Sequence, residues 1–281
     1  MIRAKILGTG AAVPKKILSN ADLEKLVETS DEWIVSRTGI RERHIVSEGE
    51  HFSDLCTRAG ELALKRAQVK PEDVDMILVG TISGDMTFPA TSCLVQRNLG
   101  AVRAAASDVG AACVGFLYAL HLADGLIQSG KAHNVLVIGG EILSRYVDWT
   151  DRNTCVLFGD GAGAVLLQAT KGDHGILGSI MKSNGAYHDF ICMPGGGSDH
   201  PANDPKSIEK RLPFLCGVTK ICVKKKGSSL NETLDTVERG LILEAMKESG
   251  GVQTRAAERL GISERVLRYK LNKFKVGTGE E

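Results

Sequence analysis

The sequence predicts an α/β protein with a mixed or mostly parallel sheet and helices on both faces, followed by a small all-α domain. Short apolar runs alternate with stretches of helical period as far as Pro213. A segment rich in glycine and proline, around Gly195-Gly196-Gly197, precedes the change to purely helical periodicity. Charge changes there too, because residues 216–276 hold 8 Lys and 5 Arg against 7 acidic residues, whereas the remainder is net acidic.

Length and composition restrict the class of protein. The 281 residues suffice for one or two domains. Seven cysteines without a Cys-x-x-Cys pair argue against a zinc cluster or a disulfide framework and favour reduced thiols. No signal-peptide pattern follows Met1, and no apolar run approaches the roughly 18 residues of a membrane span. We therefore expect a cytoplasmic protein with no bound metal and no membrane contact.

The elements can be assigned in chain order. A helix begins at Asn20 with Leu23, Leu26 and Val27 on one face, and Ser30 caps a second helical segment that carries Trp33 and Ile34. The glycine-rich turn at 159–163 lacks the Gly-Lys-Ser/Thr ending of a phosphate loop. The other expected elements are a strand at 2–8 closed by a glycine turn, a helix at 53–67, a strand at 74–80, a helix ending at 99–100, and strands at 104–109, 134–140 and 162–167.

Cys113 is the strongest candidate for chemistry. It follows the apolar run 104–109 and Gly110, and it precedes a segment in which Phe116 and later apolar residues recur at helical spacing. The first amides of a helix have no internal partner, and the helix dipole adds partial positive charge, so a thiolate at this point is stabilised. The sequence predicts a nucleophile here. The alternative is a small buried apolar residue, which is the commonest role of a free cysteine.

The segment Asp108-Val109-Gly110-Ala111-Ala112-Cys113-Val114-Gly115-Phe116 resembles the active-site segment of the β-ketoacyl-acyl carrier protein synthase III family of thiolase-fold condensing enzymes. The resemblance extends from Ile2 to about Pro213. It implies that Cys113 accepts an acyl group from acyl-coenzyme A, for decarboxylative condensation with malonyl-acyl carrier protein at the start of fatty acid synthesis, with no permanently bound cofactor. Further matched runs are Gly8-Thr9-Gly10, 20–24, 29–43, Thr150-Asp151-Arg152 and 158–163.

The same resemblance implies a coenzyme A site. The residue matching Trp33 stacks on the adenine, those matching Thr29 and Arg37 line the same site, and the one matching Arg152 packs on the other side of the base. Trp33 and Arg37 are one helical turn apart, hence on one face. The alternative for Trp33 is an ordinary core aromatic residue. The resemblance also places Phe88 at a homodimer interface, although local packing of a loop aromatic explains it equally well.

Beyond Pro213 the family pattern ends. A complete enzyme of this family has a second, similar half that supplies a histidine and an asparagine for decarboxylation, and neither has a counterpart here. His174, His188 and His200 do not stand in the required motif. We therefore expect impaired condensation, and we leave open whether another chain completes the site.

The C-terminal segment predicts a helix-turn-helix. A helix with Leu234, Val237, Leu241, Ile242 and Ala245 on one face ends at 250–251, a short helix follows at 254–260, and Ser263 caps a last helix whose inner face is Leu267, Leu271 and Phe274. In this motif the second helix of the pair enters the major groove of DNA. A solvated helical hairpin is the alternative.

The segment resembles the Fis-type DNA-binding domain of sigma-54-dependent response regulators. The resemblance implies phosphate contacts from Thr254, Arg255 and Lys270, and places Ser263, Glu264 and Arg268 near bases of duplex DNA. Residues 224–226, three lysines, would add unspecific attraction or keep a linker solvated.

The predicted domains are a thiolase-like condensing-enzyme domain at 1–213, a linker at 214–229 and a Fis-type helix-turn-helix domain at 230–276. Three hypotheses for function follow: an acyltransferase, a sequence-specific DNA-binding regulator, and a fusion or truncation product without selected function. The abrupt junction from Leu212 to Cys216 motivates the third.

Overall fold

A computed structural model describes residues 2–188, 191–201, 203, 205, 230–260 and 262–274. The chain divides into two compact units, one comprising Met1–Gly185 and Pro194–Leu215 and the other comprising Ala186–Met193 and Cys216–Glu281. The predicted linker at 214–229, which includes residues 224–226, falls outside the described residues, and the domain boundaries stay a prediction.

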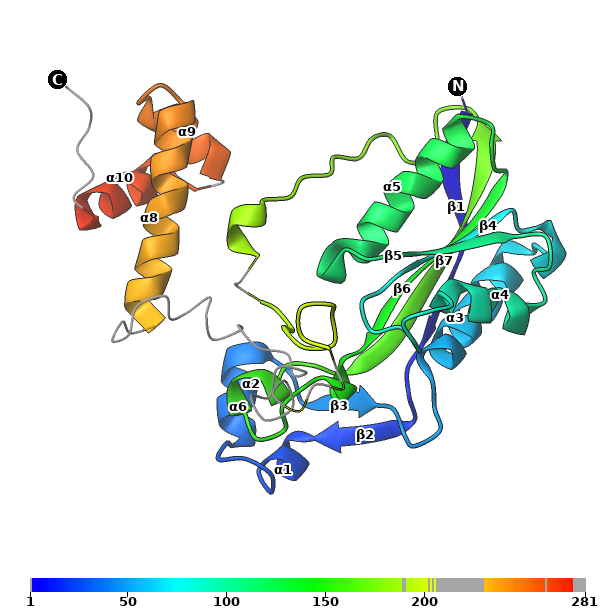
Figure 1. Cartoon of the computed structure of the whole chain (residues 1–281). Helices are drawn as coiled ribbons and strands as arrows, with labels where there is room; N and C mark the ends of the chain where they lie inside the picture. The colour runs from blue at the N-terminus through cyan, green and yellow to red at the C-terminus, as the bar shows by residue number, and fades with distance from the viewer. Residues whose placement is uncertain are drawn as a thin grey trace. The chain divides into compact units, whose positions relative to one another are not determined.

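The larger unit is built around a five-stranded mixed sheet (Figure 1). Its order is β1-β7-β6-β4-β5. β4 runs parallel to β5 and β6, whereas β7 runs antiparallel to β6 and β1, so the sheet is only half parallel. The strands are β1 (Ile2–Ala12), β4 (Met76–Gly80), β5 (Ala105–Val109), β6 (Asn134–Ile142) and β7 (Asp160–Lys171).

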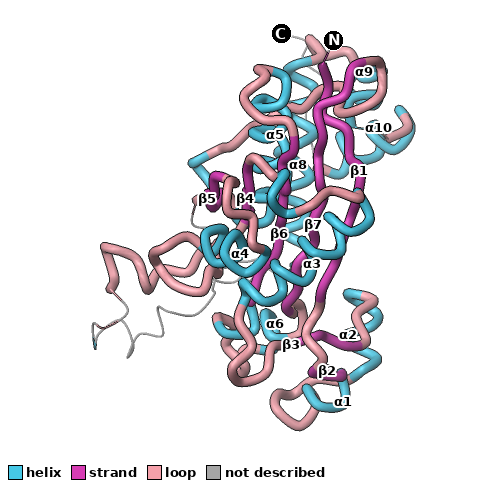
Figure 2. The backbone as a smooth tube through the Cα atoms, turned by 90° about the vertical axis from the view of Figure 1, so that its right-hand side faces the viewer, coloured by secondary structure: helices cyan, strands magenta, loops and turns pink. Residues whose placement is uncertain are grey.

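Helices cover both faces of the sheet, as predicted. α3 (Phe52–Ala67) and α4 (Thr91–Leu99) bury one apolar core with Ile77, Leu136 and Leu166, and Figure 2 shows α3 lying across the long strands. α5 (Gly115–Gln128) buries a second core on the other face, around Ile127 and Val137. Within the part of the chain that the structure describes, short 3-10 helices occur at Pro71–Asp73, Ala112–Val114, Leu143–Arg145 and Gly185–Tyr187.

The glycines near the start of the chain do not form the turn that the sequence suggested. β1 continues through them to Ala12, and the pairing register with β7 shifts between Ile6 and Gly8. A Cβ on Gly8 would lie 2.2 Å from the carbonyl oxygen of Ala63, and one on Gly10 would lie 2.0 Å from that of Ala59. These glycines therefore let α3 approach the strand closely, which is the other common reason for glycine within a strand.

Similarly, the glycine-rich turn predicted at 159–163 is mostly strand. β7 begins at Asp160, and Gly161 and Gly163 lie within it, paired with Glu141 and Gly139 of β6. A Cβ on Gly140 would lie 2.4 Å from the carbonyl oxygen of Gly161. Close approach of backbones therefore accounts for Gly140, and neither Gly161 nor Gly163 lies in a chain reversal.

A small layer lies at one end of the sheet (Figure 1). It contains a two-stranded sheet, β2 (Lys16–Ser19) and β3 (Glu42–Ile45), with helices α1 (Asn20–Leu23), α2 (Asp31–Thr38) and α6 (Arg152–Cys155). Leu23, Ile34, Val147, Cys155 and Val156 form its core. The helix from Asn20 is shorter than predicted, since Leu26 lies beyond its end with 56% of its surface exposed. The predicted Ser30 cap is confirmed, because its hydroxyl accepts the Trp33 amide.

The described residues of the smaller unit form the helices α8 (Leu230–Glu248), α9 (Gln253–Leu260) and α10 (Glu264–Lys273). Ser263 caps α10 by accepting the Val266 amide, as predicted. The prediction that Leu241 lies on the buried face of this helix is wrong, because its side chain is 54% exposed. The side chains of Leu234 and Val237 lie outside the described part of the chain. The buried core consists of Ile242, Ala245, Met246, Ala256, Ala257, Leu267 and Leu271.

No helix in the described part of the chain is both long enough and apolar enough to span a membrane.

Candidate functional site

Cys113 lies between β5 and α5, at the junction that the sequence predicted. It sits in the 3-10 turn Ala112–Val114, two residues before the first residue of α5, and its side chain is exposed. Ala112 adopts a left-handed φ of 44°, which is uncommon for a residue other than glycine. No side chain caps α5, whose start is the end where the helix dipole is positive, and the Gly115 amide there donates to the carbonyl oxygen of Ala112. The alternative of a buried cysteine is wrong.

The sulfur opens into a pocket of about 490 Å³. Glycines make room for it: a Cβ on Gly80 would lie 2.5 Å from the backbone of Gly115, and one on Gly139 would lie 2.7 Å from Cβ of Phe116. The first turn of α5 can therefore rest directly on the ends of β4 and β6. The full lining is Thr9, Gly10, Gly80, Ala112, Cys113, Phe116, Gly139, Gly140, Glu141, Gly163, Ala164 and Val165.

Glu141 is a second ionisable residue of this pocket, beside Cys113, and no sequence pattern singled it out. Its carboxylate accepts hydrogen bonds from the Thr81 hydroxyl at 2.9 Å, the Ile82 amide at 3.0 Å and the Ser83 hydroxyl. Burial raises the pKa of the Glu141 carboxyl, although these hydrogen bonds act to lower it. A carboxylate directly after two glycines at the end of an apolar strand was the signal for it in the sequence.

The predicted coenzyme A residues come together in the small layer. The guanidinium carbon of Arg37 lies 4.8 Å from the centre of the Trp33 ring, and that of Arg152 lies at the same distance. Both distances are within cation–π range. Arg37 is one helical turn from Trp33 on α2, as predicted, whereas Arg152 comes from α6, more than a hundred residues away in sequence.

Two further observations surround this cluster. Arg152 donates a hydrogen bond from Nη1 to the carbonyl oxygen of Glu28, at 2.8 Å. The hydroxyl oxygen of Thr29, the next residue, is buried without a hydrogen-bond partner. Buried hydroxyls are normally paired, so an unpartnered one beside a predicted ligand site is an available donor or acceptor.

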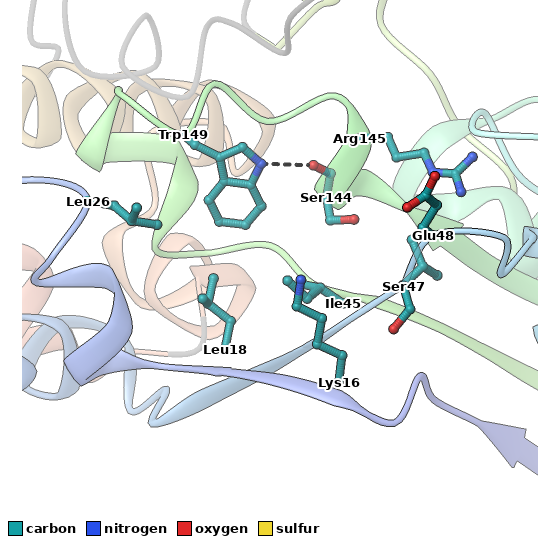
Figure 3. Close-up of a pocket in the computed structure, with 10 residues that line it drawn as sticks. Lys16, Leu18, Leu26, Ile45, Ser47, Glu48, Ser144, Arg145 and Trp149 are labelled. Atoms are coloured by element: carbon teal, nitrogen blue, oxygen red, sulfur yellow. Dashed lines mark hydrogen bonds between the residues drawn. The ribbon is translucent and has the colours of Figure 1, made fainter.

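The small layer also carries a second pocket, of about 420 Å³ (Figure 3). Its apolar side includes Leu18, Ile45 and Trp149, and the Trp149 indole donates to the carbonyl oxygen of Ser144 at 3.1 Å. Lys16, Glu48 and Arg145 add both signs of charge to the lining, and Figure 3 shows Glu48 beside Arg145. No pattern in the sequence predicted this pocket.

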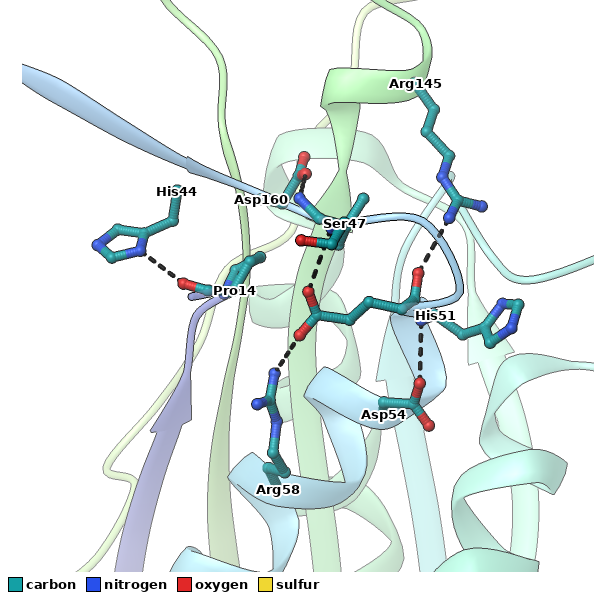
Figure 4. A network of polar contacts seen from close by, with 10 residues as sticks. Pro14, His44, Ser47, His51, Asp54, Arg58, Arg145 and Asp160 are labelled. Carbon is teal, nitrogen blue, oxygen red and sulfur yellow. Dashed lines mark hydrogen bonds and ion pairs between the residues drawn. The ribbon is translucent and has the colours of Figure 1, made fainter. Parts of the chain in front are cut away.

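Polar contacts fasten the loop between β3 and α3 to the main sheet (Figure 4). Glu50 accepts hydrogen bonds from Arg58 at 2.8 Å through its carboxylate and from Arg145 at 2.9 Å through its backbone carbonyl. Asp160, the first residue of β7, accepts from the amides of Val46 and Ser144. These contacts attach the small layer to the five-stranded sheet of the same unit, the one that contains Cys113.

The predicted DNA-contacting residues differ in their availability. Thr254 and Arg255 on α9 and Ser263 before α10 are exposed. Arg268 is exposed as well, but its guanidinium donates to Glu264 at 2.6 Å along the same helix. Lys270, predicted to contact phosphate, forms an ion pair with Glu238 of α8.

Comparison with known proteins identifies the larger unit. The chain is 50% identical over 238 residues to the beta-ketoacyl-(acyl carrier protein) synthase III of Caldanaerobacter subterraneus subsp. tengcongensis, a match that takes in 83% of this chain and 72% of that protein. The chain belongs to the β-ketoacyl-(acyl carrier protein) synthase III family. The Rhodospirillum centenum member of that family is 53% identical over 201 residues, covering 70% of this chain and 62% of the relative. The family model for 3-oxoacyl-(acyl carrier protein) synthase III matches residues 107–185, which include Cys113 and Arg152.

Solved structures of the synthase III family give the same result. The chain aligns with the enzyme from Aquifex aeolicus VF5 with a TM-score of 0.69 and 35% identity, covering 99% of this chain and 92% of that one. The Thermus thermophilus enzyme gives a TM-score of 0.70 and 33% identity, over 92% and 81% of the two chains. The predicted thiolase-like fold is therefore confirmed.

The smaller unit matches a second family model. Residues 233–274 match the model of the Fis family of bacterial regulatory proteins, and this range holds all six predicted DNA-contacting residues. The predicted resemblance of this synthase III family member to a Fis-type domain is confirmed, whereas the roles of individual residues stay predictions.

Proposed function

We propose that the chain is an acyltransferase in which Cys113 takes an acyl group from acyl-coenzyme A. The observation that carries the proposal is the exposed Cys113 sulfur at the uncapped start of α5, opening into a pocket lined by residues of four strands, β1, β4, β6 and β7. In the reaction the thiolate forms a bond to the thioester carbonyl carbon. The tetrahedral oxyanion accepts hydrogen bonds from backbone amides at the cysteine, and the coenzyme A thiolate leaves and takes up the proton that the cysteine released.

The coenzyme binds, in this proposal, through its purine against Trp33. A base inserted between the indole and Arg152 needs two contacts of about 3.5 Å each, hence a gap of about 7 Å. The present separation of 4.8 Å is too small. Arg152 must therefore move away by about 2 Å, with loss of its hydrogen bond to Glu28, before it closes over the base.

The second half-reaction, condensation with malonyl-acyl carrier protein, requires a histidine and an asparagine that the sequence does not place in the family motif. We infer that self-acylation proceeds while condensation is impaired. The test is intact-protein mass spectrometry after incubation with acetyl-coenzyme A. One acetyl group should be added to the wild type and to Cys93→Ser, and none to Cys113→Ser. Acylation that survives Cys113→Ser contradicts the assignment.

A separate assay addresses condensation. Steady release of carbon dioxide from malonyl-acyl carrier protein that depends on Cys113 would refute the inference that this half-reaction is impaired.

We also propose that the chain forms a homodimer. Phe88 is 83% exposed, so local packing does not account for it, and an exposed aromatic side chain of this size favours an interface. Sedimentation of the wild type and of Phe88→Ser tests this. Equal, monomeric behaviour of both proteins would count against the dimer.

A second candidate function is sequence-specific DNA binding by the smaller unit. It rests on the capped α10 with Arg265 and Arg268 at its surface, preceded by the short α9 in the order of a helix-turn-helix. Binding to selected duplexes should weaken steeply with salt. Arg268→Ala should lower affinity for a specific site by about 1–3 kcal/mol, whereas Arg259→Ala, which lies outside the predicted contact set, should have a smaller effect. Absence of duplex binding at low salt would exclude this function.

A further inference from the structure

A buried chain of hydrogen bonds links the two helices that carry the indole–guanidinium cluster of Trp33, Arg37 and Arg152. It runs from Arg43 on β3 through Asn20 at the start of α1 to Asp31 at the start of α2. Arg43 and Asn20 are 4% and 2% exposed, so water does not compete for these bonds. Neither residue contacts the cluster directly in any hydrogen bond or ring contact that the structure records among its described residues.

One end of this series of hydrogen bonds holds α6 in place. Arg43 donates to the carbonyl oxygen of Val156 from both Nε, at 3.1 Å, and Nη2, at 2.5 Å. Val156 is the C-cap of α6, where helix carbonyls lack intrahelical partners and the dipole favours a cation. The guanidinium therefore anchors the end of a helix only four residues long, and Arg152 is the first of those residues.

The other end fixes α2. Arg43 donates from Nη1 to Oδ1 of Asn20 at 2.5 Å. Asn20 passes the connection on, because its Nδ2 donates to Asp31 at 2.7 Å and to the carbonyl oxygen of Ile40 at 2.9 Å. These two acceptors lie immediately at the beginning and just past the end of α2, the helix that carries Trp33 and Arg37.

We propose that Asn20 and Arg43 are positioning residues that hold α2 against α6, and so set the affinity of the Trp33–Arg152 cluster for the aromatic base of a nucleotide. The apolar core of the layer already supplies packing, but apolar contacts are not directional and allow small slides. Hydrogen bonds to a planar guanidinium and an amide fix distance and orientation. Burying the Arg43 guanidinium without a carboxylate contact costs free energy. Packing alone does not require a buried cation, so its directional hydrogen bonds point to a positioning role. The inference rests on the proposed binding of coenzyme A.

The experiment uses the full chain carrying Trp149→Phe, so that Trp33 is the sole tryptophan of the two in the sequence. Asn20→Asp keeps an acceptor for Arg43 but replaces the donor that faces Asp31 with a second carboxylate oxygen. Asn20→Ala removes the three hydrogen bonds of the Asn20 side chain. If the Asn20→Ala protein does not fold, Asn20→Ser is used instead. Asn98→Ala is the matched control, because Asn98 makes its contacts on α3 and α4, away from the small layer.

Two ligands and one spectroscopic signal are measured for each variant. The ligands are adenosine 3′,5′-bisphosphate, which carries the aromatic base, and phosphopantetheine, which lacks it. We expect Asn20→Asp and Asn20→Ala to weaken the nucleotide by roughly tenfold or more and to leave phosphopantetheine within about twofold. Trp33 emission should shift to longer wavelength in both, since the indole becomes more exposed. Asn98→Ala should change neither ligand affinity nor emission.

Each other outcome decides the question. Equal weakening of both ligands would assign the bonds to general stability and overturn the proposal, and so would unchanged nucleotide affinity. If the parent protein binds neither ligand, the proposed coenzyme A site fails. The Trp33 emission still judges the positioning role in that case, because unchanged emission in Asn20→Asp and Asn20→Ala would overturn it independently.

Discussion

The guanidinium of Arg152 lies 4.8 Å from the centre of the Trp33 ring, although the two residues come from helices far apart in the sequence. Arg37 occupies an equivalent position from within the same helix as Trp33. A cation placed against an indole in this way stabilises both partners and is poised to cover a flat aromatic ligand.

Replacing Arg152 should weaken coenzyme A binding. Arg152→Ala removes a cation–π partner worth about 0.5–2 kcal/mol, so the dissociation constant measured by calorimetry should rise about 2- to 30-fold. Arg152→Lys should restore little of this, because a lysine ammonium lacks the planar face that stacks on a base. Arg103→Ala, at an exposed arginine away from the cluster, is the control. Full rescue by lysine would indicate a simple charge effect.

Gly10 should not tolerate a side chain. In Gly10→Ala the new methyl group would lie 2.0 Å from the backbone oxygen of Ala59, so strand and helix must separate. We expect the free energy of unfolding, measured with urea, to fall by about 1–3 kcal/mol. Gly163→Ala is a matched change on the neighbouring strand, where the nearest atom is 3.9 Å away, and it should stay within about 0.5 kcal/mol. Equal effects would argue against the close contact between β1 and α3.

The Glu141 carboxyl should make stability depend on pH. Its pKa is raised in the folded protein by burial, so the folded state binds more protons than the unfolded state above the ordinary value of 4.5. Its contribution is therefore complete below that pH and is lost as pH rises through the folded pKa. We expect Glu141→Gln to remove this component when unfolding is measured between about pH 4 and pH 8. Parallel profiles for the two proteins would contradict the raised pKa.

Lys270 should serve the fold of the smaller unit more than contact with DNA. Its ion pair with Glu238 is only partly exposed, at 25% and 34% for the two side chains. Lys270→Ala should lower the free energy of unfolding by about 1 kcal/mol. The slope of log affinity for a duplex against log salt concentration should change less in Lys270→Ala than in Arg255→Ala. In Arg255→Ala the slope should fall by about one if Arg255 contacts a phosphate. A full unit of slope lost in Lys270→Ala at unchanged stability would show that the pair opens on DNA.

Much of the fold could be predicted because local signals agreed with it. The Ser30 and Ser263 caps, the apolar strands and the strand-to-helix junction at Cys113 depend on residues close in sequence. The glycines at 8, 10, 161 and 163 were wrongly assigned to turns, since all four lie within strands. Gly8 and Gly10 show why, because a glycine required by a distant helix looks the same in the sequence as one required by a turn.

The candidate site shows the same division. The Trp33–Arg37 pair follows from helical spacing, whereas the approach of Arg152 was predicted only through the family resemblance. Glu141 was missed, since its burial and its partners Thr81 and Ser83 come from a neighbouring strand end. The ion pair that engages Lys270 was missed for the same reason, because Glu238 lies on another helix. Interactions of long sequence separation carry no local periodicity that a sequence pattern can reveal.

The pairing of β1 with β7 has a consequence for biosynthesis. Ile2 pairs with Lys171, so the first strand leaves the ribosome long before its hydrogen-bonding partner exists. At 5–20 residues per second the delay is on the order of ten to thirty seconds. During that interval the nascent strand offers unpaired amides and carbonyls, and the sheet closes only when almost the whole condensing-enzyme unit has been translated.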